Sequence, residues 1–356
     1  MGYKILAINP GSTSTKIALY EDEKELFCET LNHPHKEIEK YAKVQEQFEM
    51  RKDVVLSCLR KHGFDVDQLS AVVGRGGMLP SVKSGAYIVN QQMLDRLINN
   101  PAMEHASNLG ALIAYEIANL AGISAYIYDS VRVDELKPIA RISGMPEITR
   151  ASSSHALNTR AMAIKLAKKL GRKYSDMNFI VAHLGGGISL NVHERGQLVD
   201  VIPDDDGPFS PEGSGRVFCK DLINLCYSGK YDENTMLKKV RGNGGLKAYL
   251  NTKDAREVEE MILNGNEEAK LVYEAMAYQV AKGIGELATV VEGKVDAIIL
   301  TGGVAYSEML TSWIKKRVEF IAPVEIMPGE NEMESLAFGT LRVLRGEEEA
   351  RVYSEQ

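Results

Sequence analysis

The chain of 356 residues lacks the features of several specialised classes of protein. Its four cysteines have neither Cys-x-x-Cys nor zinc-finger spacing, which indicates reduced thiols of a cytoplasmic protein. No run of 18 apolar residues occurs, so we expect no membrane span. A basic region followed by an apolar stretch is missing from the N-terminus, so we expect no signal peptide. The formal net charge of −7 argues against a dedicated nucleic-acid or membrane binder.

Two common nucleotide-binding motifs are also absent. Gly-x-x-x-x-Gly-Lys-Ser/Thr does not occur, and Gly-x-Gly-x-x-Gly does not occur at any junction between a strand and a helix. These absences disfavour a P-loop ATPase and an ordinary dinucleotide enzyme. The composition is that of an ordinary globular protein, with 44% hydrophobic and 26% charged residues, and the length allows two domains.

What is present is a pair of similar segments, residues 4–20 and 179–193. Each has an apolar run, a turn rich in glycine or hydroxyl side chains, and a second run of alternating polarity. A charged turn and a third run follow in both. Turns that expose backbone N–H groups can bind a polyphosphate from two sides. The repeat therefore predicts a nucleotide held in a cleft between two duplicated domains.

The rest of the sequence alternates between helical and strand patterns, which predicts mixed α/β domains. We expect a domain of residues 1–150 plus 331–356 and another of residues 151–330, with the last helix packed on the first domain. Beyond the two three-stranded units, strands are predicted at 69–73, 123–128, 295–300 and 324–327. Helices are predicted at 34–59, 91–99, 107–120, 154–169, 219–229, 254–264, 267–292, 307–317 and 332–346.

Three glycine-containing turns are candidate nucleotide contacts. After Gly11, the N–H groups of Ser12, Thr13 and Ser14 can converge on an anion, although the segment can also be a simple hairpin turn. Lys16 follows in the strand, where alternation can place it outside the site. Gly185, Gly186 and Gly187 form the matching turn, and Gly302, Gly303 and Val304 follow a strand where flat backbone lets a nucleoside approach.

Four side chains near strand or helix ends are candidates for chemistry. Arg75 suits a carboxylate or phosphate because its planar fork binds two oxygens, or it is a solvated arginine in a turn. Asp129 can bind a metal or accept a proton, or cap a helix. His155 can donate to a phosphoryl oxygen, or is a buried histidine at a helix start. His183 ends a strand, where a structural role is the simpler interpretation.

Two further patterns resemble metal sites without matching one. His33 and His35 form a lone pair in a predicted loop, which usually lies at the surface. The acidic run 204–206 lacks the twelve-residue pattern of a calcium loop, so it is interpreted as a polar turn.

Together these segments resemble the acetate kinase family, and within it the butyrate kinase branch. The resemblance runs nearly from end to end, and in this order and spacing its motifs are highly specific. Its carriers are Ile8-Asn-Pro-Gly-Ser-Thr-Ser-Thr-Lys16, Val73-Gly-Arg-Gly-Gly77, Tyr128-Asp129, Ser154-His-Ala156, Ala182-His-Leu-Gly-Gly-Gly187, Asp206-Gly-Pro-Phe-Ser-Pro-Glu212, Thr301-Gly-Gly-Val-Ala305 and Pro328-Gly-Glu-Asn-Glu332.

The resemblance implies a fold and residue roles. The fold is the duplicated one of actin, hexokinase and Hsp70, with a mixed five-stranded sheet in each domain. Asn9 and Glu332 match positions near a magnesium–phosphate centre, and Arg75 matches the arginine that binds the substrate carboxylate or the transferred group. Asp129 matches an active-site aspartate, and His155 matches the histidine that contacts the phosphoryl group. The implied nucleotide contacts are Asn9, Gly11, Ser12, Thr13, Ser14, Lys16, His183, Gly185, Gly186, Gly187, Gly302, Gly303 and Val304.

The chain departs from the family pattern at two places. Gly186 stands where acetate kinases carry an asparagine, so one side-chain amide contact is absent. Gly213 stands where the family usually has an arginine, and Arg216, three residues later, is a candidate to supply that charge. The identity of a second catalytic arginine is therefore open.

The implied activity is reversible phosphoryl transfer from ATP to a short-chain fatty acid, butyrate or isobutyrate, with ATP/ADP and Mg2+ and no nucleic-acid or membrane partner. The resemblance also implies a homo-oligomer, a dimer or larger. Two alternatives stay open. A sugar or polyol kinase of the same superfamily would use Asp129 as base, whereas the arginine-centred Gly74-Arg75-Gly76 favours an anionic acceptor. A nucleotide-operated chaperone or filament subunit would need a peptide-binding domain or polymerising surfaces.

Overall fold

The computed structural model describes residues 2–354, and the chain forms two compact units. Unit 1 runs to Asp134 and resumes at Asn331, and unit 2 is Glu135–Glu330. The predicted first boundary, near residue 150, therefore lies later than the observed one. The reason is that the intervening segment bonds to the second sheet: Lys137 N–H donates to the Val199 carbonyl (3.0 Å), and Arg150 donates to the Val201 carbonyl (2.8 Å). Within the described residues, no helix has the length and apolar character needed to cross a membrane.

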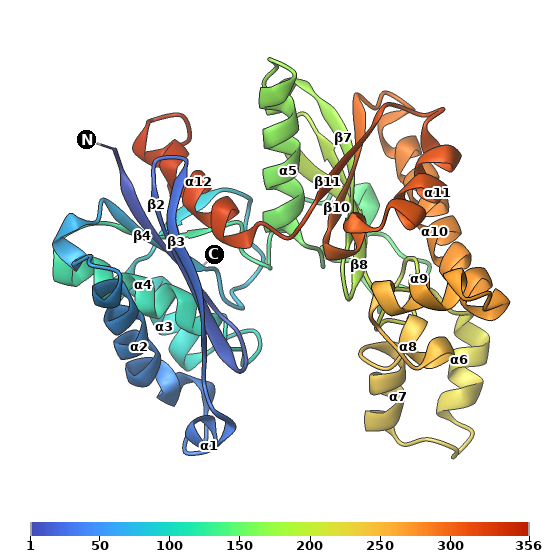
Figure 1. Cartoon of the computed structure of the whole chain (residues 1–356), viewed down its shortest axis with the longest axis horizontal. Helices are drawn as coiled ribbons and strands as arrows, with labels where there is room; N and C mark the ends of the chain where they lie inside the picture. The colour runs from blue at the N-terminus through green and yellow to red at the C-terminus, as the bar shows by residue number, and fades with distance from the viewer. Residues whose placement is uncertain (1, 355–356) are drawn as a thin grey trace. The chain divides into compact units, whose positions relative to one another are not determined.

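A seven-stranded mixed sheet forms the centre of unit 1, in the order β12-β5-β6-β4-β1-β2-β3 (Figure 1). Strands β1, β2 and β3 are an antiparallel meander, and β4 and β6 continue the sheet parallel to β1. The strands are β1 (Lys4–Pro10), β2 (Ser14–Glu21), β3 (Lys24–Asn32), β4 (Ala71–Arg75), β5 (Ala86–Ile88), β6 (Ala125–Tyr128) and β12 (Arg351–Val352).

Helices cover both faces of this sheet, which explains why β1 and β4 are buried on both sides and show no alternation of polarity. On one face α4 packs on β4, β6 and β1, with α2 against α4, and on the other α12 contacts β1, β4 and β6 (Figure 1). The helices are α1 (His35–Ile38), α2 (Phe48–Lys61), α3 (Gln91–Asn99), α4 (Asn108–Ala121) and α12 (Glu332–Leu344).

The predicted helix over residues 34–59 is broken into α1, a short 3-10 turn and α2. The carboxylate of Glu46 accepts hydrogen bonds from the N–H groups of Ala42 (2.8 Å) and Lys43 (3.3 Å). A side chain that captures backbone donors in this way competes with helical hydrogen bonds. The break therefore has a local cause that the apolar spacing did not reveal.

Unit 2 contains a five-stranded sheet in the order β11-β10-β7-β8-β9. Helix α5 packs on one face, and α10 with α11 packs on the other (Figure 1). The strands are β7 (Asn178–Leu184), β8 (Ile188–Glu194), β9 (Gln197–Ile202), β10 (Ala297–Gly302) and β11 (Val324–Pro328). The helices are α5 (Ala156–Lys169), α6 (Cys219–Cys226), α7 (Glu233–Val240), α8 (Gly245–Leu250), α9 (Ala255–Leu263), α10 (Glu267–Ala288) and α11 (Glu308–Val318).

The two sheets repeat one topology, which confirms the predicted duplication. The order β3-β2-β1-β4-β6 has the same strand directions as β9-β8-β7-β10-β11. Even the register shift recurs, at Leu19/Tyr20 between β2 and β3 and at Val192/His193 between β8 and β9. The first sheet is larger than the predicted five strands because β5 and β12 extend it. These two strands have three and two residues, too short to leave a recognisable pattern.

Candidate functional site

Three candidate side chains of unit 1 lie at the carboxyl ends of neighbouring strands. Asn9 lies near the end of β1, Arg75 ends β4, and Asp129 follows β6. These strands are parallel and adjacent, with Ile8 opposite Gly74 and Arg75 opposite Tyr128. Their carboxyl ends therefore form one edge, the usual position of a ligand site in an α/β sheet.

Glu332, the first residue of α12, joins two of these side chains. Its carboxylate accepts a hydrogen bond from Nδ2 of Asn9 (2.6 Å) and forms an ion pair with Nη1 of Arg75. A carboxylate in the first turn of a helix is also favoured by the helix dipole. The structure thus brings together Asn9, Arg75 and Glu332. One carboxylate with an amide oxygen beside it fits Mg2+, which takes few protein oxygens and keeps several waters.

Asp129 is buried, with 1% of its surface exposed, and has a left-handed backbone (φ 39°). Its Oδ1 accepts a hydrogen bond from the Gly85 N–H (2.7 Å), and its own N–H donates to the Gly85 carbonyl (3.2 Å). A carboxylate held by backbone N–H in this way is suited to organising the sheet edge. A strained residue at such an edge is typical of functional sites.

The first glycine turn connects β1 to β2. Gly11 N–H donates to the Ser14 carbonyl (2.8 Å), while Ser12 and Thr13 are exposed at the tip. Lys16 is paired with Asn9 across the two antiparallel strands. Residues opposite each other in such a pair share one face of the sheet. Lys16 therefore lies on the face of Asn9, and its exposed side chain is available to a ligand there.

Sequence reasoning missed His105, which lies before α4. The pKa of its imidazole is held below the ordinary value by burial and by the positive charge of Arg75. Its Nδ1 is 2.8 Å from the hydroxyl of Ser107. No motif surrounds it in the sequence, so only the tertiary structure reveals its place beside Arg75.

In unit 2 the two candidate histidines are stacked on each other. The rings of His155 and His183 have centroids 3.9 Å apart and planes inclined by 10°. Nδ1 of His155 contacts the Ser189 hydroxyl (2.9 Å), and Nδ1 of His183 contacts Oδ1 of Asn158 (2.8 Å). His155 stands before α5 and His183 near the end of β7. Sequence reasoning missed Asn158 and Ser189, which orient the two rings.

The second glycine turn connects β7 to β8, as the first connects β1 to β2. Gly185 N–H donates to the Gly187 carbonyl (3.1 Å), and the Gly186 carbonyl accepts from Glu212 N–H (3.1 Å) and the Ser210 hydroxyl (2.7 Å). A Cβ atom at Gly187 would lie 3.0 Å from the Asp204 carboxylate. The polar turn at residues 204–206 thus packs beside the glycine turn.

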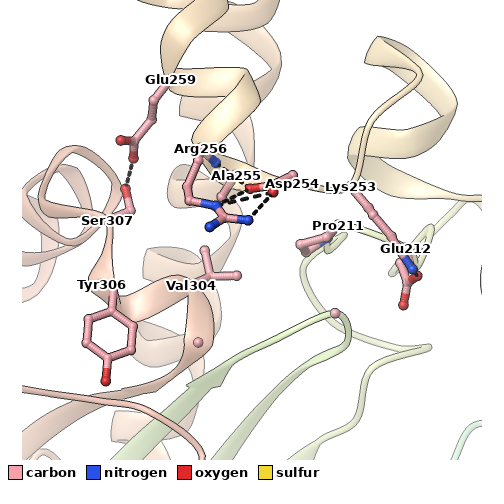
Figure 2. Close-up of a pocket in the computed structure, with 12 residues that line it drawn as sticks. Pro211, Glu212, Lys253, Asp254, Ala255, Arg256, Glu259, Val304, Tyr306 and Ser307 are labelled. Carbon is pink, nitrogen blue, oxygen red and sulfur yellow. Dashed lines mark hydrogen bonds and ion pairs between the residues drawn. The ribbon is translucent and has the colours of Figure 1, made fainter.

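A pocket of about 800 Å³ extends from this turn to the third glycine segment (Figure 2). Gly186, Glu212, Arg256, Gly303 and Val304 are among its lining residues. The guanidinium of Arg256 is bound by the neighbouring Asp254, and the Ser307 hydroxyl donates to Glu259, as the dashed lines in Figure 2 show. The volume of this pocket and its mixture of polar and apolar lining residues are typical of a site for a small organic ligand.

Gly302 is required at its position by geometry. Its backbone has φ 90°, and a Cβ atom there would lie 2.3 Å from the carbonyl oxygen of Leu184. Gly302 and Gly329 exchange both of their backbone hydrogen bonds (3.2 and 3.0 Å). This close approach brings the ends of β10 and β11 together beside the pocket, and that a nucleoside approaches the backbone there stays a prediction.

Arg216 is held by two carboxylates. Its guanidinium forms ion pairs of 3.3 Å with Asp206 and with Glu286 of α10. These partners raise the pKa of Arg216, although its partial burial acts in the opposite direction. Its role as the replacement for the arginine expected at Gly213 stays a prediction.

Arg241 is a second candidate for that role. Its backbone pairs with Gly213 in an isolated bridge, and its Nη2 is 2.8 Å from Oδ2 of Asp204. Asp204 is the carboxylate that packs beside Gly187. Sequence reasoning missed Arg241 because it lies 28 residues after Gly213, at the end of a short helix.

Known proteins resemble the chain along its whole length. The Acetokinase family matches residues 149–331. "Butyrate kinase 2" of Clostridium acetobutylicum is 53% identical over 355 residues, covering 99% of this chain and 100% of that protein. "Butyrate kinase 1" of the same organism is 52% identical, covering 99% of each.

Solved structures confirm the fold. Acetate kinase from Porphyromonas gingivalis has a TM-score of 0.78 at 19% identity, covering 96% of this chain and all of that chain. A ROK hexokinase from Thermus thermophilus has a TM-score of 0.52 at 13% identity, covering 96% of this chain and all of that chain. At such identities the likeness concerns the fold alone. The identity to curated relatives over nearly the full length, together with the matched segment, shows that the chain belongs to the Acetokinase family.

Proposed function

We propose that the protein transfers the γ-phosphoryl group of ATP reversibly to the carboxylate of a short-chain fatty acid, butyrate or isobutyrate. The products are an acyl phosphate and ADP. The observation that carries this proposal is Arg75, placed with Asn9 and Glu332 at one sheet edge, in a chain similar throughout to butyrate kinases. An arginine fork at such an edge is suited to an anionic acceptor rather than a neutral hydroxyl.

The chemistry needs little help to create its nucleophile. A fatty-acid carboxylate is already ionised at neutral pH because a carboxyl pKa is about 4 to 5. The main barrier is the repulsion between this anion and the anionic γ-phosphate. Arg75 and His155 would donate hydrogen bonds to the acceptor and to the phosphoryl oxygens, which stabilises the charge of the transition state. Asp129, buried and bound to Gly85 N–H, would organise the edge rather than remove a proton.

ATP is the implied co-substrate, and Mg2+ is the implied metal ion. Glu332 and the amide oxygen of Asn9 would hold Mg2+, and the ion would supply positive charge to the phosphate oxygens. Arg75 now pairs with Glu332, so its guanidinium would exchange this partner for the substrate when the metal occupies the carboxylate. The adenosine would occupy the pocket of unit 2, with Gly303 and Val304 against it. That both glycine turns contact one polyphosphate stays a prediction.

Trapping the product tests the proposed reaction. The purified protein would be incubated with Mg·ATP, hydroxylamine and formate, acetate, propionate, butyrate or isobutyrate in separate reactions. Acyl phosphates yield hydroxamates, and we expect the largest yield from butyrate or isobutyrate. EDTA should abolish the yield, and added Mg2+ should restore it. ADP release with a sugar or glycerol and no hydroxamate from any acid would instead favour the sugar or polyol kinase.

A protein that binds ATP without acid-dependent ADP release would favour the non-enzymatic alternative.

We also propose a homo-oligomer of at least two chains and a cytoplasmic location. The exposed apolar residues of unit 2, including Phe218, Ile223 and Tyr227 around α6, are consistent with contact between copies. Light scattering on the eluted protein would measure the mass of the assembly, and a monomer would contradict the first of these proposals.

A further inference from the structure

Arg51, on α2, is fully buried beneath the first glycine turn, with 0% of its surface exposed. Its guanidinium donates hydrogen bonds to the carbonyl oxygens of Gly11 (2.8 Å), Ser12 (3.0 Å) and Ser14 (3.0 Å). Three carbonyl groups of the four-residue segment 11–14 thus point inward to a single cation. The arginine fork can satisfy several acceptors at once, which the single nitrogen of a lysine does with less geometric control.

The planarity of the peptide group gives this arrangement a second consequence. In a trans peptide the C=O of one residue and the N–H of the next point in opposite directions. No cis peptide bond occurs among residues 2–354. Because the carbonyls of Gly11 and Ser12 point to Arg51, the N–H groups of Ser12 and Thr13 point away from it. Both residues are exposed, and within residues 2–354 neither N–H has a hydrogen-bond partner.

Two successive N–H groups that point the same way into solvent form a concave donor site for an anion. The charge of Arg51 adds to this effect. Its remaining hydrogen bonds go to the hydroxyl of Thr15 (3.1 Å) and to Oε1 of Gln47 (2.8 and 3.1 Å), so no described carboxylate neutralises it. Burial lowers its pKa to about 10, so it is still a cation at neutral pH.

The environment of Arg51 also disfavours a positive charge on the neighbouring His33. His33 Nε2 contacts the Thr15 hydroxyl (2.8 Å), and the pKa of His33 is held below its ordinary value by burial and by the charge of Arg51. A buried cation without a counter-ion is costly unless a ligand or its hydrogen bonds compensate it. An anion at the outer side of the turn would supply the missing charge.

We propose that Arg51 is a positioning residue that holds the peptide groups of the first turn with the N–H groups of Ser12 and Thr13 outward, where they bind the terminal phosphate of ATP. This inference rests on the proposed function. In this proposal the side chain of Arg51, which is remote in sequence from the first glycine turn, sets the geometry of that turn. AMP, which lacks the terminal phosphates, would not use this turn.

Substitution of Arg51 tests this role by comparing two nucleotides. Arg51→Gln and Arg51→Lys would be measured by calorimetry with AMP and with a non-hydrolysable Mg·ATP analogue. In Arg51→Gln we expect the Kd for the analogue to rise at least about 10-fold, while the Kd for AMP changes less than about twofold. Arg51→Lys keeps the charge without the fork and should give an intermediate rise. Val55→Ala, one turn further along α2 and fully buried, is the matched control and should leave both Kd values unchanged.

Two results would overturn the inference. One is a Kd for the ATP analogue that stays within twofold of the wild-type value in folded Arg51→Gln protein. The other is an equal loss of affinity for AMP and for the analogue, which a merely structural role would produce. If neither variant folds, hydrogen exchange of the wild-type protein decides. The analogue, but not AMP, should protect the amides of Ser12 and Thr13, and equal exchange contradicts the inference. Because these measurements need no fatty acid, a protein that binds the analogue but makes no acyl phosphate refutes the proposed function alone.

Discussion

His155 and His183 stack with ring centroids 3.9 Å apart. The amide nitrogen of Asn158 donates to the carbonyls of Gly329 (3.2 Å) and Glu330 (2.7 Å), so its oxygen faces Nδ1 of His183. Nδ1 of His183 therefore carries a hydrogen, assigned from this network. Two charged imidazoles at this distance would repel each other. We infer that His183 supports the ring of His155, and that His155 is the one to donate to the phosphoryl group.

The first prediction concerns His155. His155→Ala should lower kcat by about 100- to 1,000-fold, the usual cost of removing one well-placed donor to a transition state. The KM for ATP should change little because the adenosine contacts remain. Steady-state kinetics would measure both constants, with circular dichroism as the check on folding. A kcat within tenfold of the wild type would show that His155 is not the donor.

Removing the charge of Arg75 should be at least as damaging. Arg75→Ala should lower kcat/KM for the fatty acid at least about 100-fold, since the acceptor anion loses its cation. Arg75→Lys keeps the charge but not the two-pronged geometry, so it should recover only part of this loss. Both variants would be assayed over a range of acid concentrations. Turnover close to wild type in folded Arg75→Ala protein would refute the assignment of this residue.

The two candidates for the second arginine can be separated by a matched pair of substitutions. Arg241→Ala should lower kcat at least about 10-fold if its guanidinium assists the phosphate at the glycine turn. If Arg241 fills the role, Arg216→Ala should change kcat less than about threefold, since losing half-exposed ion pairs costs little. The reverse order of effects would return the role to Arg216.

Adjacent glycines of the third turn should respond differently to substitution. Gly302→Ala should destabilise the protein by at least about 1–3 kcal/mol because of its positive φ and the approach of Leu184. Gly303 has open space around a Cβ atom, so Gly303→Val should fold normally but raise the KM for ATP about 10-fold by narrowing the pocket. Urea unfolding and kinetics measure the two effects, and an unchanged KM would place the nucleotide elsewhere.

Buried His193 should make stability depend on pH. Burial, with a smaller contribution from the charge of Arg160, lowers its pKa from 6.5 to about 3. A depressed histidine pKa means that the unfolded chain binds the proton first. The stability contributed by neutral, buried His193 is therefore fully present above pH 6.5. It is lost as the pH falls towards 3, by up to about 1.4 kcal/mol of unfolding free energy per pH unit. The free energy of unfolding would be measured with urea at several pH values between 7 and 5. It should depend less steeply on pH in His193→Gln than in the wild type, and equal pH dependences would contradict this prediction.

Much of the fold could be predicted because its signals are local. The meanders at Lys4 and Phe179, the long helix α10 and the strand before Gly302 all have clear apolar spacing. The break of the helix at Glu46 and the short strand β5 escaped prediction. The break depends on hydrogen bonds from backbone N–H groups to the Glu46 side chain, and β5 has only three residues, so apolar spacing reveals neither.

The duplicated pattern, the three glycine turns and the candidate side chains at strand ends can be recognised in the sequence, because these features depend on neighbours along the chain. Which side chains meet is a property of the folded chain. Glu332 lies 257 residues from Arg75, and Arg51 lies 40 residues from Gly11, yet both pairs are in hydrogen-bond contact. Parallel strands and the helices covering them bring distant segments to one sheet edge. The partners of a charged side chain there depend on its position in the fold rather than on spacing in the sequence.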